Sequence, residues 1–73
     1  MKQLDMDEAL RVQRTVQQAW LSIPGVVGID VALVEVRPGV RAPALRVFVS
    51  SRDRAGVKEL PAELDGVPVV IIE

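Results

Sequence analysis

One stretch of this 73-residue chain has the residue types of a phosphate-binding loop. Gly25-Val26-Val27-Gly28 matches the bare G-x-x-G pattern of KH domains, whose loop holds a nucleic-acid backbone. In KH domains that loop joins two helices. Here it joins an expected helix to an expected strand, and its middle residues are valines rather than donors or cations. The pattern therefore indicates a helix stop followed by a tight entry into a strand.

A second candidate for anion binding is the chain's one concentration of basic residues, Arg46, Arg52, Arg54 and Lys58. These side chains could contact phosphate or an acidic partner, which would make the chain a nucleic-acid accessory domain. More often, such a cluster forms a solvated helix face with local ion pairs. The net charge of −1 also argues against general affinity for nucleic acid or anionic membranes. Nucleic-acid binding is therefore the alternative function rather than the leading one.

Catalytic and metal-binding chemistry has few residues to use. The chain contains neither histidine nor cysteine, which excludes histidine-assisted nucleophilic catalysis, disulfides and Cys/His zinc sites. Its ten acidic residues form no calcium-loop pattern. Ser50 and Ser51 have only Lys58 as a nearby base, and helix capping accounts for both serines. We expect no enzyme, no cofactor and no metal.

A helix is expected over residues 6–22, because Asp5 and Glu8 fit a capping box and Pro24-Gly25 supplies a stop. Apolar side chains recur there at steps of three and four residues, which is typical of a helix with one buried stripe. The stripe consists of Ala9, Val12, Val16, Ala19, Trp20 and Ile23.

The rest of the chain reads as strand, strand, helix, strand. Residues 27–36 and 44–50 are β-prone and flank a Pro-Gly turn, so they are expected to form an antiparallel hairpin. Residues 51–60 suit a short helix that Gly56 weakens, and residues 61–66 a further turn. Residues 67–73, VPVVIIE, should form a last strand parallel to the second. The predicted fold class is α+β, an αββαβ two-layer sandwich with two helices on one face of a three-stranded sheet, as one domain over residues 1–73.

Such a sheet has more apolar side chains than two helices cover. Alternate residues should face the helices, and the opposite face should carry an apolar patch of a few hundred Å², a size that usually marks a partner. A β-bulge could instead turn Val34 and Val36 inward, or the domain could simply expose apolar area. The predicted interface consists of Ala32, Val34, Val36, Phe48, Val70 and Ile72.

The expected partner is a second copy, most simply in a two-fold dimer, or another protein or peptide. The terminal strand VPVVIIE is also expected to be able to pair with another chain, because it is apolar and β-prone. The absence of cysteine suits a reducing compartment, and no run approaches the roughly 20 apolar residues of a membrane span. The N-terminal residues are too polar for a signal peptide, so the expected location is the cytoplasm.

Three stretches, LSIPGVVGIDVALVEV, ALRVFVSS and LPAELDGVPVVIIE, together resemble a small αββαβ module found ahead of trypsin-like peptidase domains in bacterial proteins. The resemblance covers about residues 20–73 and implies no peptidase residues, because the chain stops where such a domain would begin. The element order also resembles the scaffold domain of iron–sulfur assembly proteins. Those proteins carry a Cys-x-x-Cys pair after the second strand, where this chain has SSRDR, so no cluster binding follows.

Overall fold

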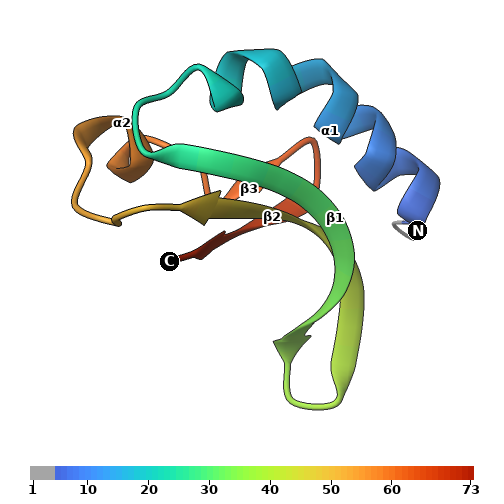
Figure 1. Ribbon diagram of the computed structural model, residues 1–73. Helices are drawn as coiled ribbons and strands as arrows, with labels where there is room; N and C mark the ends of the chain where they lie inside the picture. Colours follow the sequence, from blue (N-terminus) through green and yellow to red (C-terminus); the bar gives the residue numbers. More distant parts are fainter. Residues whose placement is uncertain (1–4) are drawn as a thin grey trace.

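The computed structural model describes residues 5–73, which fold into two helices packed on one side of a curved sheet (Figure 1). The four strands form one mixed sheet in the order β1-β2-β4-β3. The α+β class is as expected, whereas the sheet has four strands rather than three. The elements are α1 (Met6–Leu21), β1 (Val26–Arg37), β2 (Val40–Val49), α2 (Ala55–Lys58), β3 (Glu63–Leu64) and β4 (Val67–Ile72).

Helix α1 begins and ends close to the expected positions. The carboxylate of Asp5 accepts a hydrogen bond from the backbone N–H of Glu8 at 2.9 Å, which satisfies one of the free donors of the first turn. Beyond the helix, Gly25 adopts φ +99°, a conformation that β-carbon sterics make costly for other residues. Ala9 and Val12 of the expected apolar stripe are buried, but Ala19 is exposed.

Strands β1 and β2 form the expected antiparallel hairpin, with Asp30 opposite Arg46 and Leu33 opposite Pro43. Strand β4 lies parallel to β2, as expected, with Leu45 beside Val69. The hairpin is longer than the part that the helices cover. Its outer portion, residues 34–42, curls away from α1 and projects from the body of the molecule (Figure 1). We call this portion the hairpin arm.

The fourth strand, β3, occupies residues where a further turn was expected. Asp65 and Gly66 both adopt positive φ, at +51° and +82°, and join β3 to β4 as a tight antiparallel hairpin. Two consecutive positive φ values are the requirement of a type I′ turn, and Asp-Gly is a favoured pair for it. The terminal strand therefore lies inside the sheet, between β2 and β3, rather than at its edge.

The core lies between the helices and one face of the sheet, in two clusters that share Trp20. One cluster joins Ala9 and Val12 of α1 to Leu45 and Val67. The other includes Val57 of α2 with three buried strand residues. Both helices thus cover the same face. Leu45, Val47 and Val67 are fully buried, and burying each such side chain contributes roughly 1.5–3 kcal/mol.

Candidate interaction surface

The face of the sheet opposite the helices carries the predicted interface. On β1 and β2, residues on the helix side alternate with those on the outer side, and the register places Val70 beside Arg46 and Ile72 beside Phe48. Neither core cluster includes any of the six predicted interface residues. Val36 is 42% exposed, and the other five, which are Ala32, Val34, Phe48, Val70 and Ile72, are half-buried. We call this surface the open face.

Two β-bulges interrupt β1, but neither turns the predicted patch inward. The register shifts between Val26 and Gly28 and again between Glu35 and Arg37. The first bulge allows Val26 and Ile29, three residues apart, both to pack toward the helices. Between the bulges Val34 keeps its regular pairing with Ala42. The partly exposed apolar face therefore continues along β1 between the two bulges.

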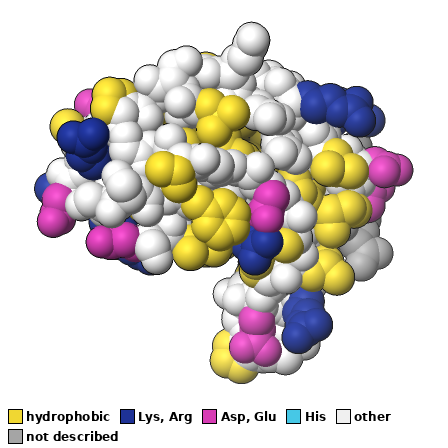
Figure 2. Space-filling model, in the orientation of Figure 1, with side chains coloured by type: hydrophobic (Ala, Val, Ile, Leu, Met, Phe, Trp, Pro, Cys, Tyr) yellow, Lys and Arg dark blue, Asp and Glu magenta, His cyan; other side chains and the backbone are white. Residues whose placement is uncertain are grey.

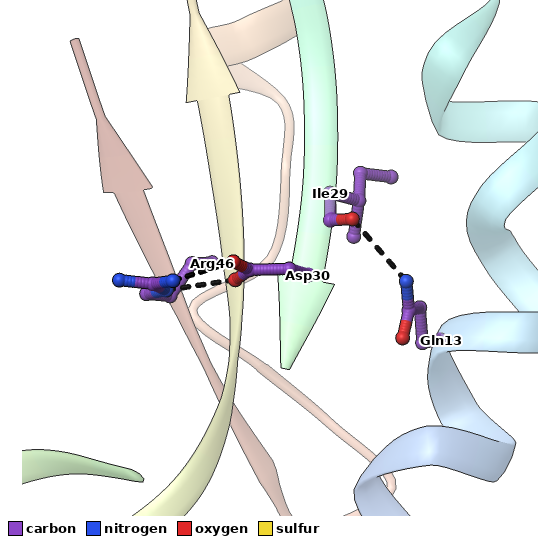
Figure 3. Close-up of polar contacts among 4 residues, drawn as sticks. All are labelled: Gln13, Ile29, Asp30 and Arg46. Atoms are coloured by element: carbon purple, nitrogen blue, oxygen red, sulfur yellow. Dashed lines mark hydrogen bonds and ion pairs between the residues drawn. The ribbon is translucent and has the colours of Figure 1, made fainter. Parts of the chain in front are cut away.

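An ion pair lies in the middle of the open face (Figure 3). Arg46 donates to Asp30 through two nitrogens, from Nε to Oδ1 at 2.7 Å and from Nη2 to Oδ2 at 2.5 Å. The hydrogen bond to Asp30 raises the pKa of Arg46 above its usual value. Its guanidinium carbon also lies 5.2 Å from the centroid of the Phe48 ring, in the range of a cation–π contact. Figure 2 shows hydrophobic side chains on both sides of an adjacent basic and acidic group, above the projecting hairpin.

The four basic residues proposed for anion contact have different surroundings. Arg46 is held by Asp30 on the open face. Arg52 donates to the backbone oxygen of Ile71 at 2.8 Å, with Glu73 3.7 Å away. Arg54 precedes α2, and Lys58 is exposed in the last turn of α2. Within residues 5–73, the guanidinium groups of Arg46 and Arg52 thus have partners.

Gly25, the first glycine of the G-x-x-G pattern, has a structural role. A β-carbon at this position would lie 2.8 Å from Cγ of Arg54, so the aliphatic stem of Arg54 packs directly over the glycine. The carbonyl of Gly25 accepts a hydrogen bond from the backbone N–H of Ser50 at 2.8 Å. These contacts fasten the helix–strand junction to the loop after β2. The backbone N–H of Val26, a donor of the kind that a phosphate loop would offer, already donates to the carbonyl of Ile23 at 3.0 Å.

The outer edge of β1 is a feature that the sequence reasoning missed. β1 has β2 on one side and no strand on the other within residues 5–73. Gln13 of α1 reaches this edge and donates from Nε2 to the carbonyl of Ile29 at 3.2 Å (Figure 3). A signal was present in the sequence, because the first strand has neither proline nor lysine, the residues that commonly protect an edge.

Other kinds of site find little support in the described part of the chain. It contains no cavity and no group of three or more acidic side chains placed to hold a metal ion. No helix among residues 5–73 is both long and apolar enough to cross a membrane.

Comparison with models of protein families, with curated proteins and with solved structures finds no match for this chain. The likeness to the peptidase-associated module therefore stays a prediction.

Proposed function

We propose that this chain is a non-enzymatic protein-interaction or self-assembly module that associates through the open face of its sheet. The observation that supports the proposal is the set of apolar side chains opposite the helices, which no layer of the described chain covers. The ion pair on this face supports it further. Because Asp30 and Arg46 neutralise each other, the face needs no charged partner and is compatible with a second copy of itself.

The size of the open face sets the expected strength of association. A patch of about 300 Å² on each of two copies would contribute roughly 15 kcal/mol at about 25 cal/mol per Å². The loss of translational and rotational freedom costs about 4–15 kcal/mol. The cost reaches the size of the gain at its upper end, and ordering of side chains and desolvation of polar groups add to it, so contact through this face alone should be of limited strength. We expect assembly to depend strongly on protein concentration.

The alternative role in nucleic-acid binding receives less support. Phosphate contacts need cations that are free to replace counterions, and Arg46 is already paired with Asp30. The net charge of −1 adds no general attraction to a polyanion. The interaction module is therefore the function that we propose.

Light scattering coupled to size-exclusion chromatography tests the proposal over a series of concentrations. We expect the mass to rise above the 8.0 kDa of one chain as the concentration increases. Val70→Lys and Ile72→Lys should lower that mass, because each places a charge on the open face. Leu21→Lys is the matched control, since Leu21 is 41% exposed but lies on α1. A parent protein that stays monomeric at high concentration would contradict self-assembly, as would a control that dissociates as readily as the two open-face variants.

A further inference from the structure

The outer edge of β1 has a defined set of unused backbone groups. The bond from Gln13 to the carbonyl of Ile29 shows that the backbone groups of Ile29 point away from β2. In a strand the N–H and C=O of every second residue point to the same side. Val31, Leu33 and Glu35 therefore also present their N–H and C=O outward. Outside the β1–β2 ladder, no hydrogen bond within residues 5–73 involves any of these three residues.

Pro43 supports the same orientation independently. It lies directly opposite Leu33 in the β1–β2 register and has no backbone N–H. A hydrogen-bonded antiparallel pair exchanges two N–H···O bonds, so proline suits a position whose backbone faces away from the partner strand. The Leu33–Pro43 pair is thus a non-hydrogen-bonded one. The backbone N–H and C=O of Leu33 must then point away from β2, toward the free edge of the sheet.

The other edge of the sheet is covered. There β3 pairs with the first two residues of β4, and the N–H of Val69 donates to the carbonyl of Ala62 at 2.9 Å. Further along, the guanidinium of Arg52 binds the carbonyl of Ile71. Among the residues that the structure describes, Gln13 alone covers the β1 edge, and the central side chain of that edge, Leu33, is 57% exposed. The two bulges and the charge of Glu35 limit the free edge to a short stretch, and within that stretch the unpaired backbone groups are a template for another strand.

The free part of this edge is bounded at both ends. At one end Gln13 occupies the carbonyl of Ile29, and at the other the bulge at Val36 ends the regular strand. The window between them runs from Val31 to Glu35, with Leu33 at its centre. Helix α1 packs against Ile29 and Val31, but Leu33 belongs to neither core cluster. Two copies related by a two-fold axis at Leu33 would place their helices on opposite sides of the axis.

We propose that a second copy of the chain pairs with this edge, antiparallel and centred on Leu33. Leu33 then lies opposite Leu33 of the second copy, and Val31 lies opposite Glu35 of the second copy. All outward N–H and C=O groups of the window are bonded in this register, and the two sheets become one. A two-fold axis midway between the two Leu33 residues gives both copies the same hydrogen bonds, and the arrangement closes at two chains. The proposal does not depend on the open face, whose residues point out of the plane of the sheet.

Single cysteines test the register, because the chain has no cysteine of its own. In a hydrogen-bonded antiparallel pair the Cα atoms are about 5.5 Å apart, within the range of about 4.4–6.8 Å that a disulfide spans. Leu33→Cys should therefore oxidise to a species of twice the 8.0 kDa chain mass. The control is Val27→Cys, since Val27 is more exposed, at 69%, but lies at the first bulge. Random collision would favour Val27→Cys.

We expect Leu33→Cys to cross-link several-fold faster than Val27→Cys. Equal rates, or a faster rate for Val27→Cys, would overturn the proposed pairing. Adding Ile72→Lys to Leu33→Cys separates this proposal from association through the open face. Cross-linking should persist in the double variant, and its loss would assign the contact to the open face instead.

Charge substitutions provide a second test that needs no oxidation. Leu33→Lys and Leu33→Glu each place like charges opposite each other across the axis, which destabilises the pairing. Made in the Ile72→Lys background, which weakens contact through the open face, each variant alone should be monomeric, and an equal mixture of the two should regain the dimer. Because Leu33 is exposed, both variants are expected to keep the parent circular dichroism spectrum. Monomers that persist in the mixture, or dimers of either variant alone, would exclude a two-fold axis at this residue.

Discussion

The two faces of the sheet differ although the same strands supply both. Along β2, Leu45 and Val47 are fully buried, whereas Arg46 and Phe48 between and beyond them are half-buried. The helices lie over the first pair, and no described element lies over the second. Both faces carry aliphatic side chains, so hydrophobicity alone does not decide which are buried. The position of α1 and α2 decides it for the larger side chains, although the small Ala44 in the same row as Arg46 is also fully buried, and the open face keeps partly exposed apolar surface.

The largest loss of stability is expected from a substitution on the face of the sheet that the helices cover. Leu45→Ala should lower the free energy of unfolding by about 2–5 kcal/mol, because it removes a fully buried side chain and leaves a cavity. Urea unfolding followed by circular dichroism measures this difference. Val70→Ala is the matched control, since Val70 is beside Arg46 on the open face. If the control costs as much as Leu45→Ala, the two faces are equally well packed and the comparison is wrong.

Gly56 tests how closely α2 approaches the loop after α1. A β-carbon at Gly56 would lie 2.5 Å from Cγ2 of Ile23. Overpacking of this kind typically costs about 1–3 kcal/mol, which exceeds the gain of about 1 kcal/mol in helix propensity from glycine to alanine. Gly56→Ala should therefore destabilise the protein, as measured by thermal or urea unfolding.

A double-mutant cycle identifies the cause of that loss. Ile23→Ala removes the atom that the new β-carbon would meet, so the double variant should be more stable than the two single losses predict. Additive losses would mean that the contact with Ile23 is not responsible.

A smaller effect is expected where α1 meets the edge of β1. Gln13→Ala removes the hydrogen bond to the carbonyl of Ile29 and should cost about 0.5–1.5 kcal/mol in unfolding free energy. Gln17→Ala, at an exposed position of the same helix, is the control and should cost less. Hydrogen exchange adds a local measurement, because losing Gln13 should speed exchange in β1 more than in β4. Uniform acceleration across the sheet would argue against a local role.

The smallest effect on stability is expected in the hairpin arm, at Val36. Val36→Lys changes a 42% exposed residue at a bulge, and such surface substitutions usually stay within about 0.5 kcal/mol. Its midpoint of urea unfolding should therefore match the parent. A loss comparable to that of Leu45→Ala would show that the arm is packed against something in solution, and measuring it at several protein concentrations would reveal whether that contact is a second copy.

Local signals in the sequence predicted much of the fold. The cap at Asp5 and the stop at Gly25 placed α1, and β-branched runs on either side of Pro38-Gly39 placed the hairpin. The parallel course of β4 followed from the charged crossover segment between two apolar runs. Each of these features depends on neighbouring residues, which is why pattern and spacing were sufficient.

Features that depend on register were not accessible in this way. Asp30 and Arg46 are 16 residues apart, and only the pairing of β1 with β2 brings them together. The strand order could not be predicted either, because no local pattern shows that β4 lies between β2 and β3. Asp65-Gly66 did carry the signal of a hairpin turn, but the two residues of β3 are too few to show a strand period. The open edge of β1 became visible only once that order was known.

The central place of β4 has a consequence for the order of folding. Its neighbours β2 and β3 do not contact each other directly in the sheet, so the two sides are joined only after the last of the six elements has been made. The β1–β2 hairpin closes a short loop and can form early, whereas parallel docking of β4 must first close the whole crossover, which is slower. Until residues 67–72 dock, the side of β2 that will face β4 has unpaired backbone groups, so a folding intermediate with the hairpin alone has two open edges rather than one.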